Sequence, residues 1–270
     1  MKISVLLSGQ SYGIDIDNPI DVSIPLRFNG EQPNTYHVPP AQSKTYEDQH
    51  FVGDTRRGGS CNFETYTLTP HCNGTHTECV GHIALERISV HRTLNQLLIP
   101  STLISIEPEP AADTSETYKP DKSEKDKLIT AKQLYYKLND FRKDFLKGLL
   151  IRTLPNEDAK KNRNYEEETA PFFSLEAIDY LTELGVEHLL IDIPSVDRAY
   201  DDGKLSVHHS FWAVPQGSHD VDPDACSVKT ITEMIFVPED IADGIYFLNI
   251  QIPAFVADAA PSRPVLYKTN

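Results

Sequence analysis

The densest group of chemically reactive side chains lies in residues 71–82, which read His-Cys-Asn-Gly-Thr-His-Thr-Glu-Cys-Val-Gly-His. Imidazole, thiolate and carboxylate groups are the ligands that zinc and related transition metals take from proteins. No other stretch of the chain concentrates these residue types as strongly. The segment therefore predicts a metal site for one or two ions.

The spacing within this segment predicts which side chains act together. His76, Glu78 and His82 are separated by even steps, and Cys72 has the same parity, whereas His71 does not. Residues separated by even steps point to one side of an extended chain. An extended segment would therefore present Cys72, His76, Glu78 and His82 to the same ions.

A second histidine group, His208-His209, follows a polar loop much later in the chain. Adjacent side chains usually face different ways, so we expect at most one of the two to bind a metal directly. Histidine pairs are more often hydrogen-bonded surface or core residues than metal ligands. This alternative stays open for His208-His209, and it applies less to the denser group at residues 71–82. Asp197 precedes it and either orients a ligand histidine or caps a turn.

Composition limits the class of protein. The chain has 270 residues, of which 39% are hydrophobic and 24% charged, which suits a folded α/β protein. The net charge of −15 argues against nucleic acid and anionic membranes as partners. No apolar run approaches the ~20 residues of a membrane span, and the first residues resemble a signal peptide only weakly. The 4 cysteines do not suggest a disulfide scaffold, so we expect a cytoplasmic protein.

Helices and strands are expected to alternate in the middle of the chain, with more strand at both ends. Thr130 and Gln133 form a capping-box pattern for one helix, and Ser174 and Gly185 mark the start and the end of another. Apolar and β-branched runs predict the strands. These runs cover residues 20–26, 63–69, 97–106, 148–153, 189–193, 229–237 and 245–252.

Two segments are expected to lie outside this framework. Residues 27–61 are rich in Asn, Gln, Gly, Pro and Arg and predict a long loop, which is usually functional or mobile. Residues 107–127 contain many charged residues and prolines and few large apolar side chains. They predict an exposed polar insertion, because they offer little surface to bury. We therefore predict one domain over residues 1–270 that carries this insertion.

The motif Gly74-Thr75-His76-x-Glu78-x-x-x-His82 resembles the His-x-Gly-Thr-His-x-Asp-x-Pro-x-His signature of the metal-dependent cyclase/kynurenine formamidase family. Residues 21–26, 150–153 and 192–197, followed by His208-His209, are similar to further segments of that family and occur in the same order. The resemblance covers most of the chain. It implies an α/β fold with a single mixed-sheet domain of the swivelling β/β/α type, assembled as a homodimer or homotetramer.

The resemblance also implies a ligand set. His76, His82 and His208 match ligand histidines of the family, and His82 also matches a nearby acid or base. Glu78 stands where an aspartate bridges two metals, and Glu233 resembles a late ligand glutamate. The first signature histidine falls on Cys72, so either a thiolate binds there and favours softer metals, or a small loop shift brings in His71. The predicted ligands of one or two Zn²⁺ ions, or alternatively of Mn²⁺, are Cys72, His76, Glu78, His82, His208 and Glu233.

The activity implied by the resemblance is metal-dependent hydrolysis of a small-molecule C–N amide, either a formamide or a cyclic amide. Water activated by the metal would attack the carbonyl carbon. The candidates for moving the proton to the leaving nitrogen are His82, His209 and Glu233. One alternative keeps the site but opens a lactone or lactam or performs a dehydration. Another is a metal- or ligand-binding protein without catalysis, which the replacements at positions 72 and 78 motivate.

Overall fold

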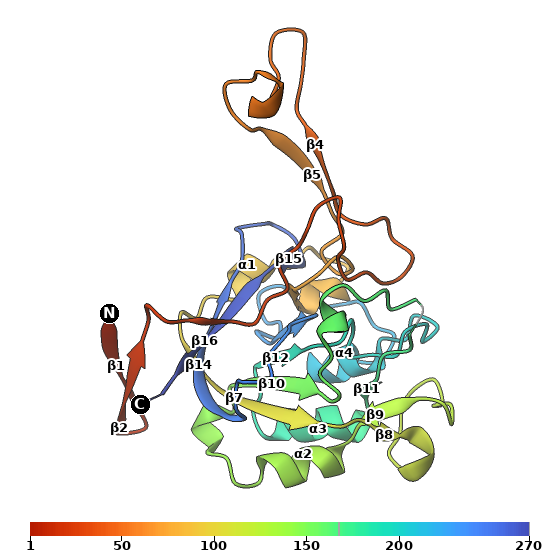
Figure 1. Cartoon of the computed structure of the whole chain (residues 1–270). Helices are drawn as coiled ribbons and strands as arrows, with labels where there is room; N and C mark the ends of the chain where they lie inside the picture. Colours follow the sequence, from red (N-terminus) through yellow and green to blue (C-terminus); the bar gives the residue numbers. More distant parts are fainter. Residues whose placement is uncertain (167, 270) are drawn as a thin grey trace.

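A nine-stranded mixed sheet forms the centre of the molecule (Figure 1). The computed structural model describes residues 1–166 and 168–269. The strands of this sheet are β3 (Ile20–Asp21), β6 (His76–Cys79), β7 (Ile99–Ile106), β10 (Gly148–Thr153), β12 (His188–Ile191), β13 (Thr230–Glu233), β14 (Gly244–Gln251), β15 (Ala259–Pro261) and β16 (Arg263–Lys268). Their order in space is β15-β6-β13-β12-β10-β7-β14-β16-β3. The predicted α/β class with one large mixed sheet is confirmed.

The strands β7, β10, β12 and β13 are parallel to one another, and β6 and β14 flank them in the antiparallel direction. Parallel strands are usually covered on both faces and contain continuous apolar runs. Every residue of β10 and β12 is buried. Leu149 and Ile151 belong to the core on one face, whereas Leu150 and Leu248 belong to the core on the other.

Helices α2 (Ala131–Leu138) and α3 (Leu175–Glu183) cover one face of the sheet (Figure 1). The predicted capping box of α2 is present, since Thr130 and Gln133 each accept a backbone hydrogen bond from the other. Ser174 caps α3 by accepting from the Ala177 amide, and Gly185 follows that helix with a φ of 82°. Both helices therefore begin where the sequence predicted.

Shorter elements surround the sheet. They are β1 (Lys2–Leu7), β2 (Gln10–Asp15), α1 (Val90–Thr93), β8 (Glu109–Pro110), β9 (Lys127–Ile129), β11 (Phe172–Phe173), α4 (Ser206–Phe211) and the 3₁₀ helices η1 (Thr55–Arg57), η2 (Val80–His82), η3 (Ala111–Asp113), η4 (Lys143–Phe145) and η5 (Asp158–Lys161). Among the described residues, no helix combines the length and apolar character that a membrane span requires.

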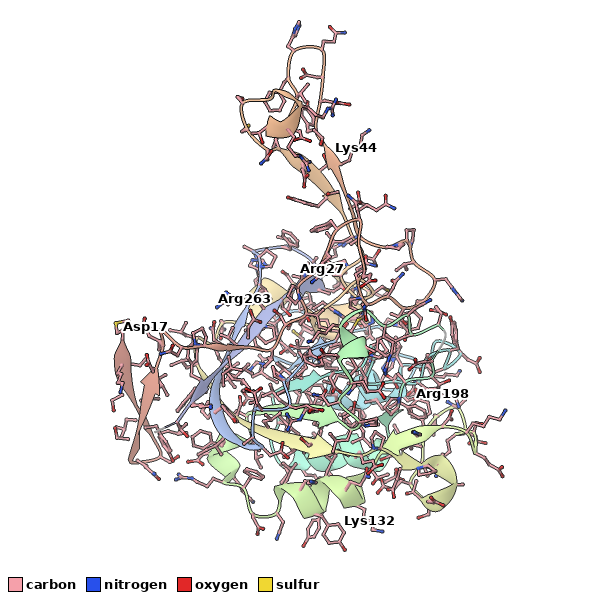
Figure 2. All side chains as sticks on the ribbon, viewed as in Figure 1. Asp17, Arg27, Lys44, Lys132, Arg198 and Arg263 are labelled. Carbon is pink, nitrogen blue, oxygen red and sulfur yellow. The ribbon has the colours of Figure 1, made fainter. Side chains whose placement is uncertain are left out.

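The segment predicted as a long loop contains half of a hairpin. Strands β4 (Gln42–Thr45) and β5 (Glu64–Thr67) pair antiparallel and extend away from the body of the molecule (Figure 1). The strand predicted at 63–69 thus pairs within this projecting hairpin and not in the main sheet. Figure 2 shows Lys44 pointing outward from it.

The strand predicted at 20–26 is limited to Ile20–Asp21. The Asp21 carboxylate accepts hydrogen bonds from the amide and the hydroxyl of Ser23, at 2.9 and 2.6 Å. The Val22 amide still donates to the Pro264 carbonyl of β16, and the regular pairing ends there.

The segment 107–127, predicted as an exposed insertion, is packed in part. Tyr118 is only 2% exposed and Ala111 only 3%, whereas most of the charged side chains are at the surface. The Glu116 carboxylate accepts the Ala131 amide at the start of α2 and is also bonded by the Ser174 hydroxyl before α3. The low apolar content of the segment did not indicate this role. An acidic side chain can hold a segment against the protein by accepting hydrogen bonds from the free backbone amides at a helix N-terminus.

Candidate metal centre

The pairing of β6 with β13 brings together ligands predicted from opposite ends of the chain. Glu233 lies directly across from His76, and Ile231 lies across from Glu78. His76 Nε2 is 3.3 Å from Glu233 Oε2. His76, Glu78 and Glu233 are exposed by only 0%, 1% and 3%, so water competes little for their donor atoms. The register of two strands therefore creates the buried part of the site.

His208 enters from α4 and is held by Asp197. Its Nδ1 lies 2.6 Å from Asp197 Oδ2, and its Nε2 lies 2.8 Å from Glu78 Oε1. The same Asp197 carboxylate accepts the backbone amides of Val207 and His208 at the start of α4. Asp197 therefore both orients the imidazole and caps the helix, the two roles left open by the sequence.

His82, His71 and Asp258 form the more open part of the site. His71 Nε2 is 3.0 Å from Asp258 Oδ2, and His82 Nδ1 is 3.4 Å from the same oxygen. The His71 and His82 rings are stacked with centroids 4.5 Å apart. Asp258 immediately precedes β15, which pairs with β6. This aspartate was not predicted, because nothing around it in the sequence distinguishes it from the other acids.

The structure places His71, and not Cys72, among the converging donors. The chain turns here, since the amides of Cys72 and Asn73 both donate to the Thr69 carbonyl, each at 3.0 Å. The segment is therefore not extended before Gly74, and the parity that favoured Cys72 does not apply. Burial and the Glu233 charge raise the pKa of the Cys72 thiol to about 11, which opposes formation of a thiolate.

Two other predicted residues differ from expectation. His82 lies in η2, beyond the end of β6, so its even spacing from Glu78 does not reflect an extended strand. It nevertheless reaches the site. His209 does not, because its Nδ1 faces the Val214 carbonyl at 3.3 Å and its ring neighbours His219. Burial lowers the pKa of His209.

The carboxylates and imidazoles of the site stabilise each other's charged forms. Burial alone would raise the pKa of Glu78, but the imidazoles of His82 and His208 hold it well below its usual range. Burial would lower the pKa of His208, and the Glu78 and Asp197 carboxylates raise it well above the ordinary value instead. The imidazoles of His71 and His82 likewise hold the pKa of Asp258 far below normal.

The residues fit a bound divalent metal. The described residues contain three groups of donors, and within each group the ligand atoms lie within 4.8 Å of one another. The groups are His71–His82–Asp258, Glu78–His82–His208 and His76–Glu78–Glu233. His82 belongs to the first and second groups, and Glu78 belongs to the second and third. Within the described part of the chain, the buried Nε2 atoms of His71 and His76 have no hydrogen-bond partner. His76 Nδ1 faces the Gly74 carbonyl at 2.9 Å, which leaves its Nε2 lone pair free for an ion.

A cavity of about 480 Å³ opens onto these donors. Tyr36, Ser195 and Tyr200 are part of its lining, together with His82 and Glu233. Tyr36 and Tyr200 meet edge to face, with ring centroids 6.1 Å apart. Tyr36 belongs to the long loop that the sequence predicted to be functional or mobile.

Comparison with known proteins agrees with this architecture. The profile described as "Putative cyclase" matches residues 14–198. The solved structure of a "predicted metal-dependent hydrolase from Bacillus stearothermophilus" has 17% identity and a TM-score of 0.56, covering 93% of this chain and 98% of its own. Isatin hydrolase A from Labrenzia aggregata has 14% identity and a TM-score of 0.60, with 94% of each chain covered. Isatin hydrolase A from Ralstonia solanacearum has 14% identity and a TM-score of 0.57, covering 93% of this chain and 91% of its own.

No curated protein matches the chain. The structural neighbours establish the fold, and the family profile spans well over half of the sequence, from residue 14 to residue 198. Their agreement confirms the resemblance inferred from the motif around His76: the chain belongs to the cyclase family.

Proposed function

We propose that the chain is a metal-dependent hydrolase of a small-molecule C–N amide, either a formamide or a cyclic amide. The observation that carries the proposal is the convergence of imidazoles and carboxylates on Glu78 at the wall of a cavity of about 480 Å³. The cavity is of a size that small ligands occupy. Isatin hydrolases are among the structural neighbours, and isatin is a cyclic amide.

The donor chemistry favours Zn²⁺ or Mn²⁺, because imidazole suits the first and carboxylate suits the second. Such an ion would polarise a substrate carbonyl and promote ionisation of water near neutral pH. Asp197 holds the His208 ring so that Nε2, and not Nδ1, faces the site. Of the predicted proton carriers, His82 and Glu233 line the cavity, whereas His209 does not line it.

The test begins with purified protein whose metal content is measured before and after chelation. Zn²⁺ or Mn²⁺ is then returned and turnover is followed on formanilides, isatin, cyclic imides and lactones. We expect hydrolysis of at least one amide, loss of activity with chelator, and recovery with metal. His76→Ala should abolish turnover, and His50→Ala, in the exposed part of the hairpin, should not.

The substrate panel also separates the alternatives. Turnover of lactones alone would replace amide hydrolysis by ester ring opening at the same site. Stoichiometric metal without turnover of any compound would contradict the proposal and favour a metal- or ligand-binding protein.

A further inference from the structure

One carboxylate ties together two loops that contribute to the wall of the cavity. The Tyr200 hydroxyl donates to Glu166 Oε2, and His37 Nε2 lies 3.0 Å from the same oxygen. Glu166 Oε1 accepts the His37 amide at 2.9 Å. Tyr200 and His37 are 34 and 129 positions away from Glu166 in the sequence. The Glu166 side chain is only 12% exposed, so water competes little for these bonds.

The backbone beside Glu166 is itself joined to the first of these loops. The Asn34 amide donates to the Arg163 carbonyl at 3.1 Å, and the Tyr165 amide donates to the Asn34 carbonyl at 2.9 Å. Tyr165 is buried. Glu166 therefore projects from an anchored segment, and its bond to Tyr200 attaches the second loop to that segment.

The residues that Glu166 holds have unusual backbone conformations. Tyr36, His37 and Tyr200 have φ values of 55°, 53° and 59°, in the left-handed region that residues other than glycine disfavour. Residues in this region persist where surrounding contacts impose the conformation, and they concentrate at sites that clamp ligands. The bonds to Glu166 are such contacts for His37 and Tyr200. Because Tyr36 directly precedes His37, the same bonds limit its movement.

Tyr36 and Tyr200 give the cavity an apolar part beside its charged donors. Both line the cavity together with His82 and Glu233. Their rings meet edge to face, and the two residues are 38% and 62% exposed, so they are not filling the protein core. Cavities that bind small ligands combine aromatic surface with a few polar groups that fix the orientation of the ligand.

We propose that Glu166 is a positioning residue, which holds Tyr36 and Tyr200 together so that the two rings bind the ring of a planar substrate while its amide faces the donors around Glu78. Glu166 acts through these rings and not on the reacting atoms. The inference rests on the proposed function, because the ligand of the rings is the substrate of that function.

The binding of two lactams isolates the contribution of the rings. Oxindole and 2-pyrrolidinone share a five-membered lactam, and only oxindole has a fused benzene ring. Each is titrated into the full-length chain loaded with Zn²⁺ and followed by ligand-observed NMR. We expect the wild type to bind oxindole about tenfold more tightly, because two aromatic contacts add to the apolar area that is buried. Glu166→Ala should reduce this preference below about threefold. Glu168→Ala, which removes an exposed partner of Arg163 in the same segment, is the charge-matched control and should keep it.

A double variant shows whether Glu166 acts through Tyr200. Tyr200→Phe keeps the ring and removes only the hydroxyl that Glu166 holds. Glu166→Ala combined with Tyr200→Phe should bind oxindole no more weakly than Glu166→Ala alone, because the two changes break one contact.

The kinetic readout separates positioning from a general loss of structure. On the amide that the wild type hydrolyses fastest, Glu166→Ala should raise KM about tenfold and leave kcat within about twofold, since only binding is lost. A damaged site would lower kcat as well.

An unchanged preference for oxindole in Glu166→Ala, strictly additive losses in the double variant, or an equal loss in Glu168→Ala would overturn the inference. A wild type that binds the two lactams equally would overturn it too. Thermal unfolding and zinc content show whether each variant is folded, and Tyr200→Phe keeps the test decisive if Glu166→Ala is not. The binding measurements need no turnover, so the inference and the proposed function fail separately.

Discussion

Tyr118 donates its phenolic hydrogen to Asp197 Oδ1 over 2.7 Å, although the two residues are 79 positions apart in the sequence. The other oxygen of this carboxylate holds His208 Nδ1. Tyr118 also accepts the Arg198 amide, and its ring packs against Phe172. A residue from the predicted insertion thus fixes the group that orients His208, a proposed metal ligand.

Tyr118→Phe should weaken metal binding with little change in the fold. The buried hydrogen bond to a charged group contributes about 1.5–3 kcal/mol to stability, and the loosened Asp197 should lower metal affinity by about tenfold. Calorimetric titration with Zn²⁺ and thermal unfolding of the metal-free protein measure the two effects. Tyr135→Phe, at an exposed site on α2, is the control. Equal metal affinity in Tyr118→Phe and the wild type would show that Asp197 needs no such support.

Metal binding should release protons, and affinity should rise with pH. Glu78 and Asp197 raise the pKa of His208 in the metal-free protein, so its proton must leave before Nε2 can bind an ion. The stability supplied by this proton is complete below the unfolded pKa of ~6.5 and is lost as pH rises through the raised folded pKa. Calorimetry in buffers of different ionisation enthalpy counts the protons released. No buffer dependence at pH 7 would contradict this expectation.

His188 should make the protein sensitive to acid independently of any metal. Burial lowers the pKa of His188 to about 4, and the neutral ring is bonded by Thr230 and Gln96. Because this pKa is depressed on folding, its stability contribution is complete above pH ~6.5 and is lost as pH falls through the folded pKa, at a cost of about 3 kcal/mol. Urea unfolding of the chelated protein at pH 7.5 and pH 4.5 should show this loss, and His188→Gln should show less of it. An equal loss in His188→Gln would assign the effect to other groups.

The sequence predicted those parts of the fold that depend on neighbouring residues. The capping box of Thr130 and Gln133 and the stop at Gly185 are local, so the helix starts and ends could be read directly. The buried runs of β10 and β12 were recognised because strands covered on both faces need continuous apolar residues. The β4–β5 hairpin was missed in part, because its first strand is short and polar.

The site could be predicted only where the residues lie close in sequence or match a motif. His76, Glu78 and His82 from the motif converge with His208 and Glu233, which the wider family resemblance implied. Whether His71 or Cys72 faces the other donors depends on a turn in which the Cys72 and Asn73 amides donate to the Thr69 carbonyl. Asp258 reaches the site through the pairing of β15 with β6, and Tyr118 reaches Asp197 while its ring packs against Phe172. Long-range contacts of this kind leave no local signal in the sequence.

The projecting hairpin should hold two copies of the chain together. Tyr46, Phe63 and Tyr66 are 44%, 54% and 56% exposed on β4–β5 and its loop, which extend beyond the body (Figure 1). Gathered apolar side chains on a surface mark sites of protein association, and the family resemblance implies a homodimer or homotetramer. We therefore expect the double variant Phe63→Ser, Tyr66→Ser to have the mass of one chain by light scattering, while the wild type has at least twice that mass. Tyr136→Ser, 72% exposed on α2, is the matched control and should not dissociate. A wild type that is already monomeric at micromolar concentration, or a double variant that stays assembled, would exclude this role for the hairpin.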